Sequence, residues 1–171
     1  MGVYYYYVNY TKRELFGIEA LGGGMKFNCI GNTLAARAFE LMLTSTKARD
    51  HQPSGPHSML GHWSGDSVAI LGDDTEPDWE RIKREFADIE ASVILLVFEV
   101  DGFERLGEAA ATDDTLFMEL CHLVVTKQAP ALAYSLQDRF GPKFLNRYGQ
   151  LCQEMPWFRP KDLVVVDHLN G

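Results

Sequence analysis

The chain has 171 residues, 46% of them hydrophobic and 23% charged, and it carries a formal net charge of −8. These values are typical of one globular domain, so we expect a single domain over residues 1–171 and no membrane-spanning segment, because the longest apolar runs are too short to cross a bilayer. The start of the chain lacks the features of a signal peptide and the three cysteines are widely spaced, which argues against a secreted disulfide scaffold and predicts a cytoplasmic protein.

The first fifty residues predict a β-rich start followed by a helix. Residues 3–8 hold four tyrosines between two valines, a composition typical of a strand. Residues 15–20 place apolar side chains on one face and suit an antiparallel partner, and residues 25–30 could form a third strand. Asn32 is expected to cap a helix that runs to about residue 43, since its side chain can accept an unpaired backbone N–H.

The middle of the chain predicts a strand–helix–strand unit. We expect a short apolar strand at residues 67–71, a helix at 79–91 capped by Asp78, and a strand at 93–100 with no polar residue before Glu99. A strand that is hydrophobic on both faces is usually central, and a connecting helix implies a parallel pair. Before this unit, residues 44–65 lack periodicity, and long segments of this kind are often functional or disordered.

The last third of the chain is predicted to be mostly helical. Helices are expected from Thr112 or Asp113 to residue 125, at 132–140 and at 142–152, followed by a final strand at 163–166. The whole pattern predicts an α/β or α+β fold. It would contain a mixed sheet of five to six strands with an N-terminal antiparallel hairpin, one parallel strand–helix–strand unit and about five helices.

Three of the predicted strands run into aspartates, which suggests a metal site. Ligands of open parallel sheets bind beyond the carboxyl ends of the strands, and convergent carboxylates suit Mg²⁺. The hypothesis is a metal-dependent hydrolase in which His57 or His62 acts as base. Its Mg²⁺ or Zn²⁺ would be bound by four carboxylates: Asp73, Asp74, Asp101 and Asp167. Aspartate is also a common turn and cap residue, which explains the same pattern without a metal.

Other catalytic signatures fail on spacing. The glycines of residues 61–65 do not flank Ser64 as a G-x-S-x-G nucleophile elbow requires. Cys121 and His122 are adjacent in a predicted helix, so their side chains diverge by about 100° and cannot form a nucleophile–base pair. The glycines at 22–24 lead to Lys26 and then Phe27, whereas a Walker loop needs serine or threonine after its lysine. These failures weigh against an enzyme.

The negative charge is concentrated in the middle of the chain. Residues 51–114 carry a net charge of −11 and the rest carries +3, so the acidic region should repel nucleic acid and attract basic proteins. We therefore favour a non-catalytic cytoplasmic protein-binding module without a cofactor, such as an immunity protein or antitoxin that neutralises a basic toxin. Its candidate contact residues are five acidic side chains and two tyrosines: Asp73, Asp74, Glu76, Asp78, Glu80, Tyr5 and Tyr7.

Two segments of the chain resemble a group of small proteins of uncharacterised function. Residues 4–12, YYYYVNYTK, are similar to an N-terminal tyrosine–valine–asparagine–threonine–lysine motif of that group. Residues 63–73, WSGDSVAILGD, are similar to its later tryptophan–glycine–aspartate motif. The resemblance covers roughly the first half of the chain and implies no activity and no site residue. It implies that the first hairpin and the strand after Trp63 belong to one core.

Overall fold

The computed structural model describes residues 3–22, 31, 33–44, 59–74 and 79–164. Within these ranges the chain forms seven α-helices and a four-stranded mixed sheet, which confirms the mixed α/β fold and the N-terminal hairpin. The sheet has the order β3-β1-β2-β4. Its strands are β1 (Tyr5–Asn9), β2 (Glu14–Gly17), β3 (Val68–Gly72) and β4 (Ala87–Asp88).

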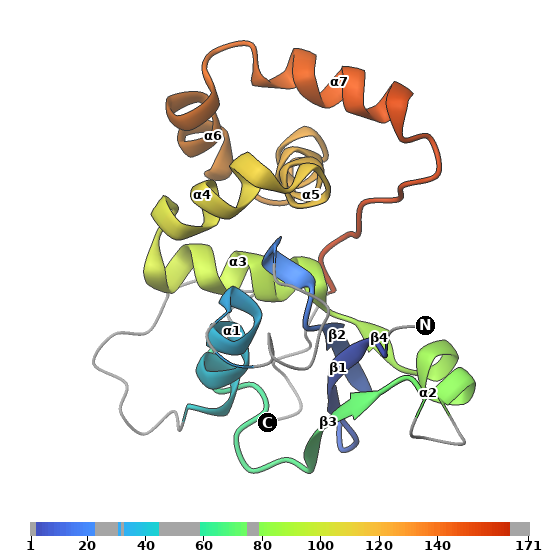
Figure 1. Ribbon diagram of the computed structural model, residues 1–171. Coiled ribbons are helices and arrows are strands. Elements are labelled where there is room, and N and C mark those ends of the chain that lie inside the picture. The colour runs from blue at the N-terminus through green and yellow to red at the C-terminus, as the bar shows by residue number, and fades with distance from the viewer. Residues whose placement is uncertain (1–2, 23–30, 32, 45–58, 75–78, 165–171) are drawn as a thin grey trace.

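The sheet packs helices on both faces because its side chains alternate. β1 pairs antiparallel with β2 and with β3. Tyr7 of β1 points into the main core, whereas Val8 points into a second, smaller core beneath α2 (Trp79–Glu85). Figure 1 shows α2 on one side of the sheet, and α1 (Leu34–Leu43) and α3 (Glu90–Asp101) on the other.

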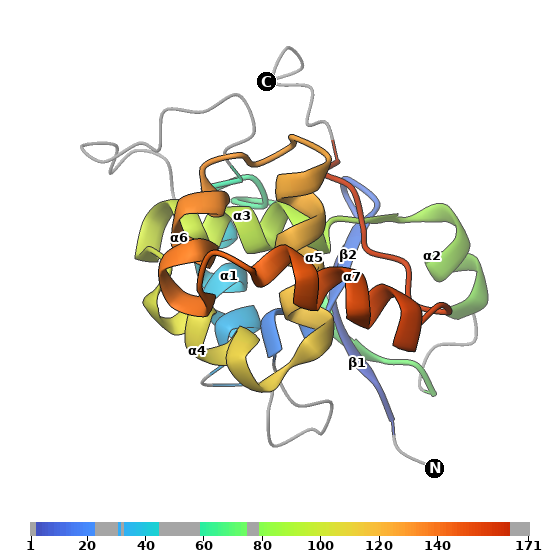
Figure 2. The ribbon, with the colours of Figure 1, turned by 90° about the horizontal axis from the view of Figure 1, so that it is seen from above.

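The remaining helices form a layer on α3, away from the sheet (Figures 1 and 2). They are α4 (Glu104–Thr112), α5 (Asp114–Val125), α6 (Leu132–Phe140) and α7 (Phe144–Glu154). Asp113 caps α5, because its side chain accepts hydrogen bonds from the backbone N–H groups of Thr115 and Leu116. After α7, residues 155–164 return to α3 without forming a helix or strand (Figure 1), and we call them the C-terminal segment.

The predicted central strand at residues 93–100 is wrong, since these residues belong to helix α3. All residues from 91 to 97 are buried, and all of them except Ser92 are apolar. A helix enclosed on all sides and a central strand both read as continuous apolar runs, and periodicity does not separate them. The predicted parallel pair of strands 67–71 and 93–100 is therefore absent from the described residues. β3, α2 and β4 do form a strand–helix–strand connection, but its two parallel strands are separated in the sheet by β1 and β2, and the direct parallel pairing is the short contact of β2 with β4.

Several other boundaries also differ from the prediction. The helix predicted at 79–91 ends at Glu85, because Ile82 is buried in the second core while Ile89 is buried in the main core. One continuous helix cannot direct both side chains to opposite sides of the sheet. Helix α4 was not predicted, and Leu163 and Val164 are not in a strand. The strand predicted at 25–30, the cap at Asn32 and residues 165–166 lie outside the described residues.

Candidate functional site

The acidic residues after β3 lie at the edge of the sheet. Asp73 is partly buried, and its Oδ1 accepts a hydrogen bond from the backbone N–H of Tyr4 at 3.1 Å. Asp74 is exposed in the turn that follows, and Glu80 is exposed in the first turn of α2. Two further predicted contact residues lie outside the described residues: Glu76 and Asp78.

The two tyrosines predicted as contact residues lie on the buried face of β1. Tyr7 is 1% exposed, and its ring stacks on Phe39 with 4.5 Å between the ring centroids, which removes it from any contact surface. Tyr5 is half-buried against the same core. Tyr4 and Tyr10 are the exposed tyrosines at the two ends of this strand, at 43% and 39%. Four consecutive tyrosines carry no signal of which face is buried, so the sequence could not separate these pairs.

β3 is an edge strand in the described part of the chain, with β1 on one side and no described strand on the other. The backbone N–H of Asp73 donates to the carbonyl of Tyr4 at 2.9 Å. This bond fixes which residues of β3 direct their backbone groups toward β1. Because alternate residues bond to the neighbouring strand, the backbone groups of Val68 and Ile70 point to the open side. The side chain of Ile70 is 41% exposed.

The aspartates of the predicted metal site do not form a metal-binding group. Asp101 ends a helix and not a strand, and Arg37 donates two hydrogen bonds to its carboxylate at 2.8 and 2.9 Å. These hydrogen bonds hold the pKa of Asp101 below its ordinary value. Among the described residues, no three His, Cys, Asp or Glu side chains are grouped so that they could hold a metal ion. Asp167 and His57 lie outside the described ranges.

A buried carboxylate joins β2 to the loop before β3. Glu14 is 8% exposed, and its Oε2 accepts a hydrogen bond from Nε1 of the fully buried Trp63 at 2.6 Å. Nε2 of His62, one of the two candidate bases of the hydrolase hypothesis, lies 3.0 Å from both carboxylate oxygens of Glu14. A buried carboxylate is costly without partners, so these contacts tie the loop to the hairpin.

A second polar cluster lies at the turn between β1 and β2. Asn9 is fully buried, donates through Nδ2 to Asp66 at 2.8 Å and accepts from the backbone N–H of Lys12 at 2.8 Å. Lys12 also forms an ion pair with Asp66. Burial acts in the opposite direction, but the hydrogen bonds from Lys12 and Asn9 hold the pKa of Asp66 below its ordinary value. The two clusters therefore bring residues 9–14 into direct contact with residues 62–66.

The C-terminal segment carries a lysine into a group of carboxylates that the sequence did not single out. Nζ of Lys161 contacts Asp88 at 2.7 Å and also Glu90, and its backbone N–H donates to Oε2 of Glu119 at 2.9 Å. Burial acts against the charge of Lys161, but Glu90 and Asp88 hold its pKa above the ordinary value. Burial raises the pKa of Glu119 to about 7. No spacing in the sequence links these positions, which the fold alone brings together.

Polar side chains also accept hydrogen bonds from the backbone beyond Lys161. The N–H of Leu163 donates to Oε1 of Gln128 at 2.6 Å, and the N–H of Val164 donates to Oγ of Ser92 at 3.2 Å. Asp162 lies 2.8 Å from Nε2 of His122. Side chains of α3, of α5 and of the turn after α5 therefore hold an extended backbone, which is a structural role for these polar groups.

Comparisons with known proteins identify no relative of this chain. No model of a protein family, no curated protein and no solved structure matches this chain. In the part of the chain that the structure describes, none of the helices combines the length and the apolar character needed to span a bilayer.

Proposed function

We propose that this chain is a non-catalytic protein-binding module whose partner is a basic protein. The observation that carries the proposal is the position of β3, an edge strand among the described strands that runs directly into Asp73 and the exposed Asp74. Glu80 follows on α2, which packs on the same sheet (Figure 1). An open strand edge next to several carboxylates offers backbone hydrogen bonds and charge complementarity to one partner.

The partner binds by adding an extended segment to β3. The backbone groups of Val68 and Ile70 supply the hydrogen bonds, and the exposed side chain of Ile70 supplies apolar contact. Carboxylates at the end of the strand favour lysine and arginine in the added segment. Strand edges of this kind are a hazard for aggregation, so a dedicated partner also gives a reason for keeping β3 open.

An immunity protein or antitoxin of the cytoplasm is the class that combines these features. The net charge of −11 over residues 51–114 speeds the approach of a basic toxin, and such electrostatic steering weakens as salt is added. The contact needs no catalytic group, in agreement with the failed spacing of the catalytic signatures.

The test identifies the partner first and then perturbs the proposed surface. Basic proteins captured on the immobilised chain from the organism that encodes it are identified, purified and titrated against two variants. Asp74→Lys/Glu80→Lys reverses two exposed charges beside β3, and Ile70→Pro blocks the open edge without removing a hydrogen bond to β1. We expect each variant to weaken binding by at least about tenfold at low salt.

The matched control is Glu108→Lys/Glu154→Lys, which makes the same change of charge at exposed positions of α4 and α7. It should keep most of the affinity, since helices α4 and α7 lie away from β3 (Figure 1). Equal affinity of the purified partner for the wild type and for both β3 variants would contradict the proposal. So would the failure of the chain to bind any basic protein.

A further inference from the structure

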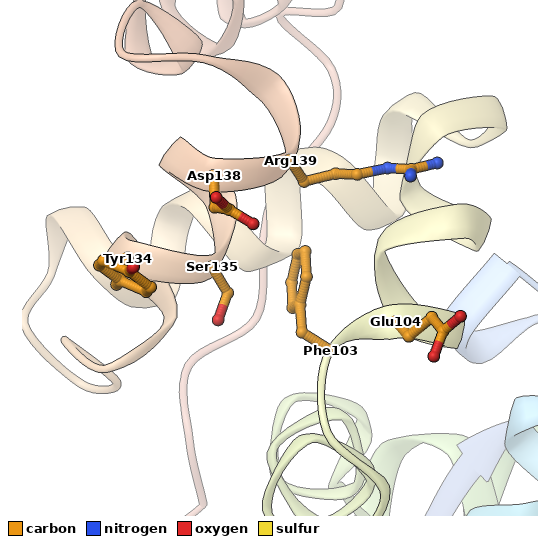
Figure 3. A pocket seen from close by; sticks show the side chains of 6 residues that line it. All are labelled: Phe103, Glu104, Tyr134, Ser135, Asp138 and Arg139. Carbon is orange, nitrogen blue, oxygen red and sulfur yellow. The ribbon is translucent and has the colours of Figure 1, made fainter.

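A hollow of about 320 Å³ lies between the start of α4 and helix α6. Six side chains line it: Phe103, Glu104, Tyr134, Ser135, Asp138 and Arg139. Figure 3 shows the rings of Tyr134 and Phe103 on opposite sides of the Ser135 and Asp138 side chains. The carboxylate of Glu104 and the guanidinium of Arg139 lie beyond Phe103 in this view. The space between the two rings is therefore bordered by a hydroxyl and a carboxylate.

The fold holds one ring of the hollow in place. Phe103 directly precedes α4, and its ring meets Phe98 edge-on with 6.3 Å between the centroids. Gly107, one turn into α4, leaves room for this ring, because a Cβ at that position would lie 2.7 Å from it. The ring of Phe103 is therefore positioned before any ligand arrives.

The opposite wall of the hollow is an exposed aromatic residue. Tyr134 is 80% exposed, more than any other large hydrophobic side chain in the described part of the chain. It lies four residues before Asp138 on α6, so both side chains are on one face of the helix. A second hollow, lined by Gln137, Gly141 and Pro142, shares Tyr134 and Asp138 with the first.

The groups around this space attract a cation. The faces of aromatic rings carry negative potential and bind ammonium and guanidinium groups within about 6 Å. The carboxylate of Asp138 and the hydroxyl of Ser135 add hydrogen-bond acceptors for the same group. No ion pair joins Asp138 to another described residue. Arg139 also lines the hollow, but in Figure 3 its guanidinium lies beyond Phe103 and not between the two rings.

We propose that the hollow between α4 and α6 binds the cationic side chain of a lysine or arginine, between the rings of Phe103 and Tyr134 and against Asp138. The aliphatic stem of such a side chain packs on the rings while its charged end reaches the carboxylate. α4 and α6 lie in the helical layer beyond α3, away from β3 (Figure 1). The hollow is therefore a separate site, and this proposal holds whether or not β3 binds a partner.

The test is an NMR titration of the ¹⁵N-labelled protein with three small probes. N-acetyl-lysine methylamide and N-acetyl-arginine methylamide carry the cation, and N-acetyl-norleucine methylamide is the uncharged control. We expect both cationic probes to shift the backbone resonances of Gly107, Ser135 and Asp138 in the millimolar range, with norleucine at least about fivefold weaker. Equal shifts with norleucine, or shifts spread evenly over acidic residues elsewhere, would overturn the proposal.

Three variants define the roles of the lining groups. Asp138→Asn and Tyr134→Ala are both at exposed positions and should each weaken the cationic probes by about fivefold, while Tyr134→Phe keeps the ring and most of the affinity. Glu108→Gln is the control, because it removes one charge from α4 outside the hollow. Unchanged affinity in Asp138→Asn and Tyr134→Ala would refute the site, and this result is independent of the variants at β3.

Discussion

Glu14 and Glu119 are the buried carboxylates of the described residues, and their surroundings differ. Glu14 lies within hydrogen-bond distance of two side chains of the loop before β3, Trp63 and His62. Glu119, on α5, is 3% exposed and accepts the backbone N–H of Lys161. Burial disfavours its charged form, which is why its pKa rises from 4.5 to about 7.

Glu119→Gln should change how stability depends on pH. The folded protein binds the Glu119 proton more tightly than the unfolded chain, so this contribution is complete below pH 4.5 and is lost as the pH rises to about 7. Its size is on the order of 3 kcal/mol. Urea unfolding of the wild type should show this loss between pH 5 and 7, whereas the variant should show a flatter profile. Parallel profiles would contradict the assignment.

Trp63→Phe should destabilise the protein by about 1–3 kcal/mol, because it leaves Oε2 of the buried Glu14 without its indole donor. Trp157→Phe is the matched control, since Trp157 is 69% exposed and should tolerate the change within about 0.5 kcal/mol. Urea unfolding followed by circular dichroism measures both. A loss as small in Trp63→Phe as in Trp157→Phe would show that the hydrogen bond contributes little.

Helices α3, α4 and α7 differ in how they are packed. α3 is buried from residue 91 to 97 and has no solvent-facing stripe along this stretch. α4 and α7 are amphipathic, and each contains one glycine, at 107 and at 149. Gly107 is buried beneath the Phe103 ring, while Gly149 is exposed with no atom within 4 Å of an added Cβ.

Alanine at these two glycines should therefore have opposite effects. Gly149→Ala should stabilise the protein by roughly 0.5–1 kcal/mol, the ordinary gain from replacing glycine inside a helix. Gly107→Ala has the same helical gain but forces its Cβ to within 2.7 Å of the Phe103 ring, and such overpacking typically costs about 1–3 kcal/mol. Thermal unfolding of both variants decides the sign, and stabilisation by Gly107→Ala would show that the ring moves freely.

The C-terminal segment connects the sheet to the helical layer. Its residues 161–164 contact β4, α3 and α5, so a stretch late in the chain joins the sheet to the helical layer (Figure 1). Lys161 is the one cation that directly contacts Asp88 and Glu90 among the described ion pairs, with Glu119 bonded to its backbone. Without the positive charge of Lys161, the negative charges of Asp88 and Glu90 would lie close together and unpaired.

Lys161→Met should destabilise the protein by about 2 kcal/mol, a value reduced from that of a fully buried pair because the side chain is 38% exposed. The loss should be larger at pH 8 than at pH 5, since the raised pKa values of Glu90 and Glu119 favour their neutral forms at the lower pH. Lys83→Met, at an exposed position of α2, is the control and should be nearly neutral. The same loss at both pH values would argue against carboxylate repulsion as its cause.

Local chemistry alone determined several elements of this protein. The hairpin of β1 and β2 follows from the tyrosine and valine composition of the first segment and from the apolar side chains on one face of the segment after the turn. The start of α5 was predicted at Thr112 or Asp113, and Asp113 is the residue whose side chain accepts hydrogen bonds from the first N–H groups of the helix. The sequence also placed exposed carboxylates at Asp74 and Glu80, because a charged side chain without a buried partner stays in water.

Only the tertiary structure decided the features that depend on what surrounds a residue. The apolar run of α3 could have been a central strand, and Tyr7 rather than Tyr4 is buried because α1 covers one face of β1. The contacts of Glu14 with Trp63 and of Lys161 with Glu90 join positions 49 and 71 residues apart. Periodicity describes the sides of one segment, whereas burial, strand pairing and pKa depend on distant segments that the fold brings into contact.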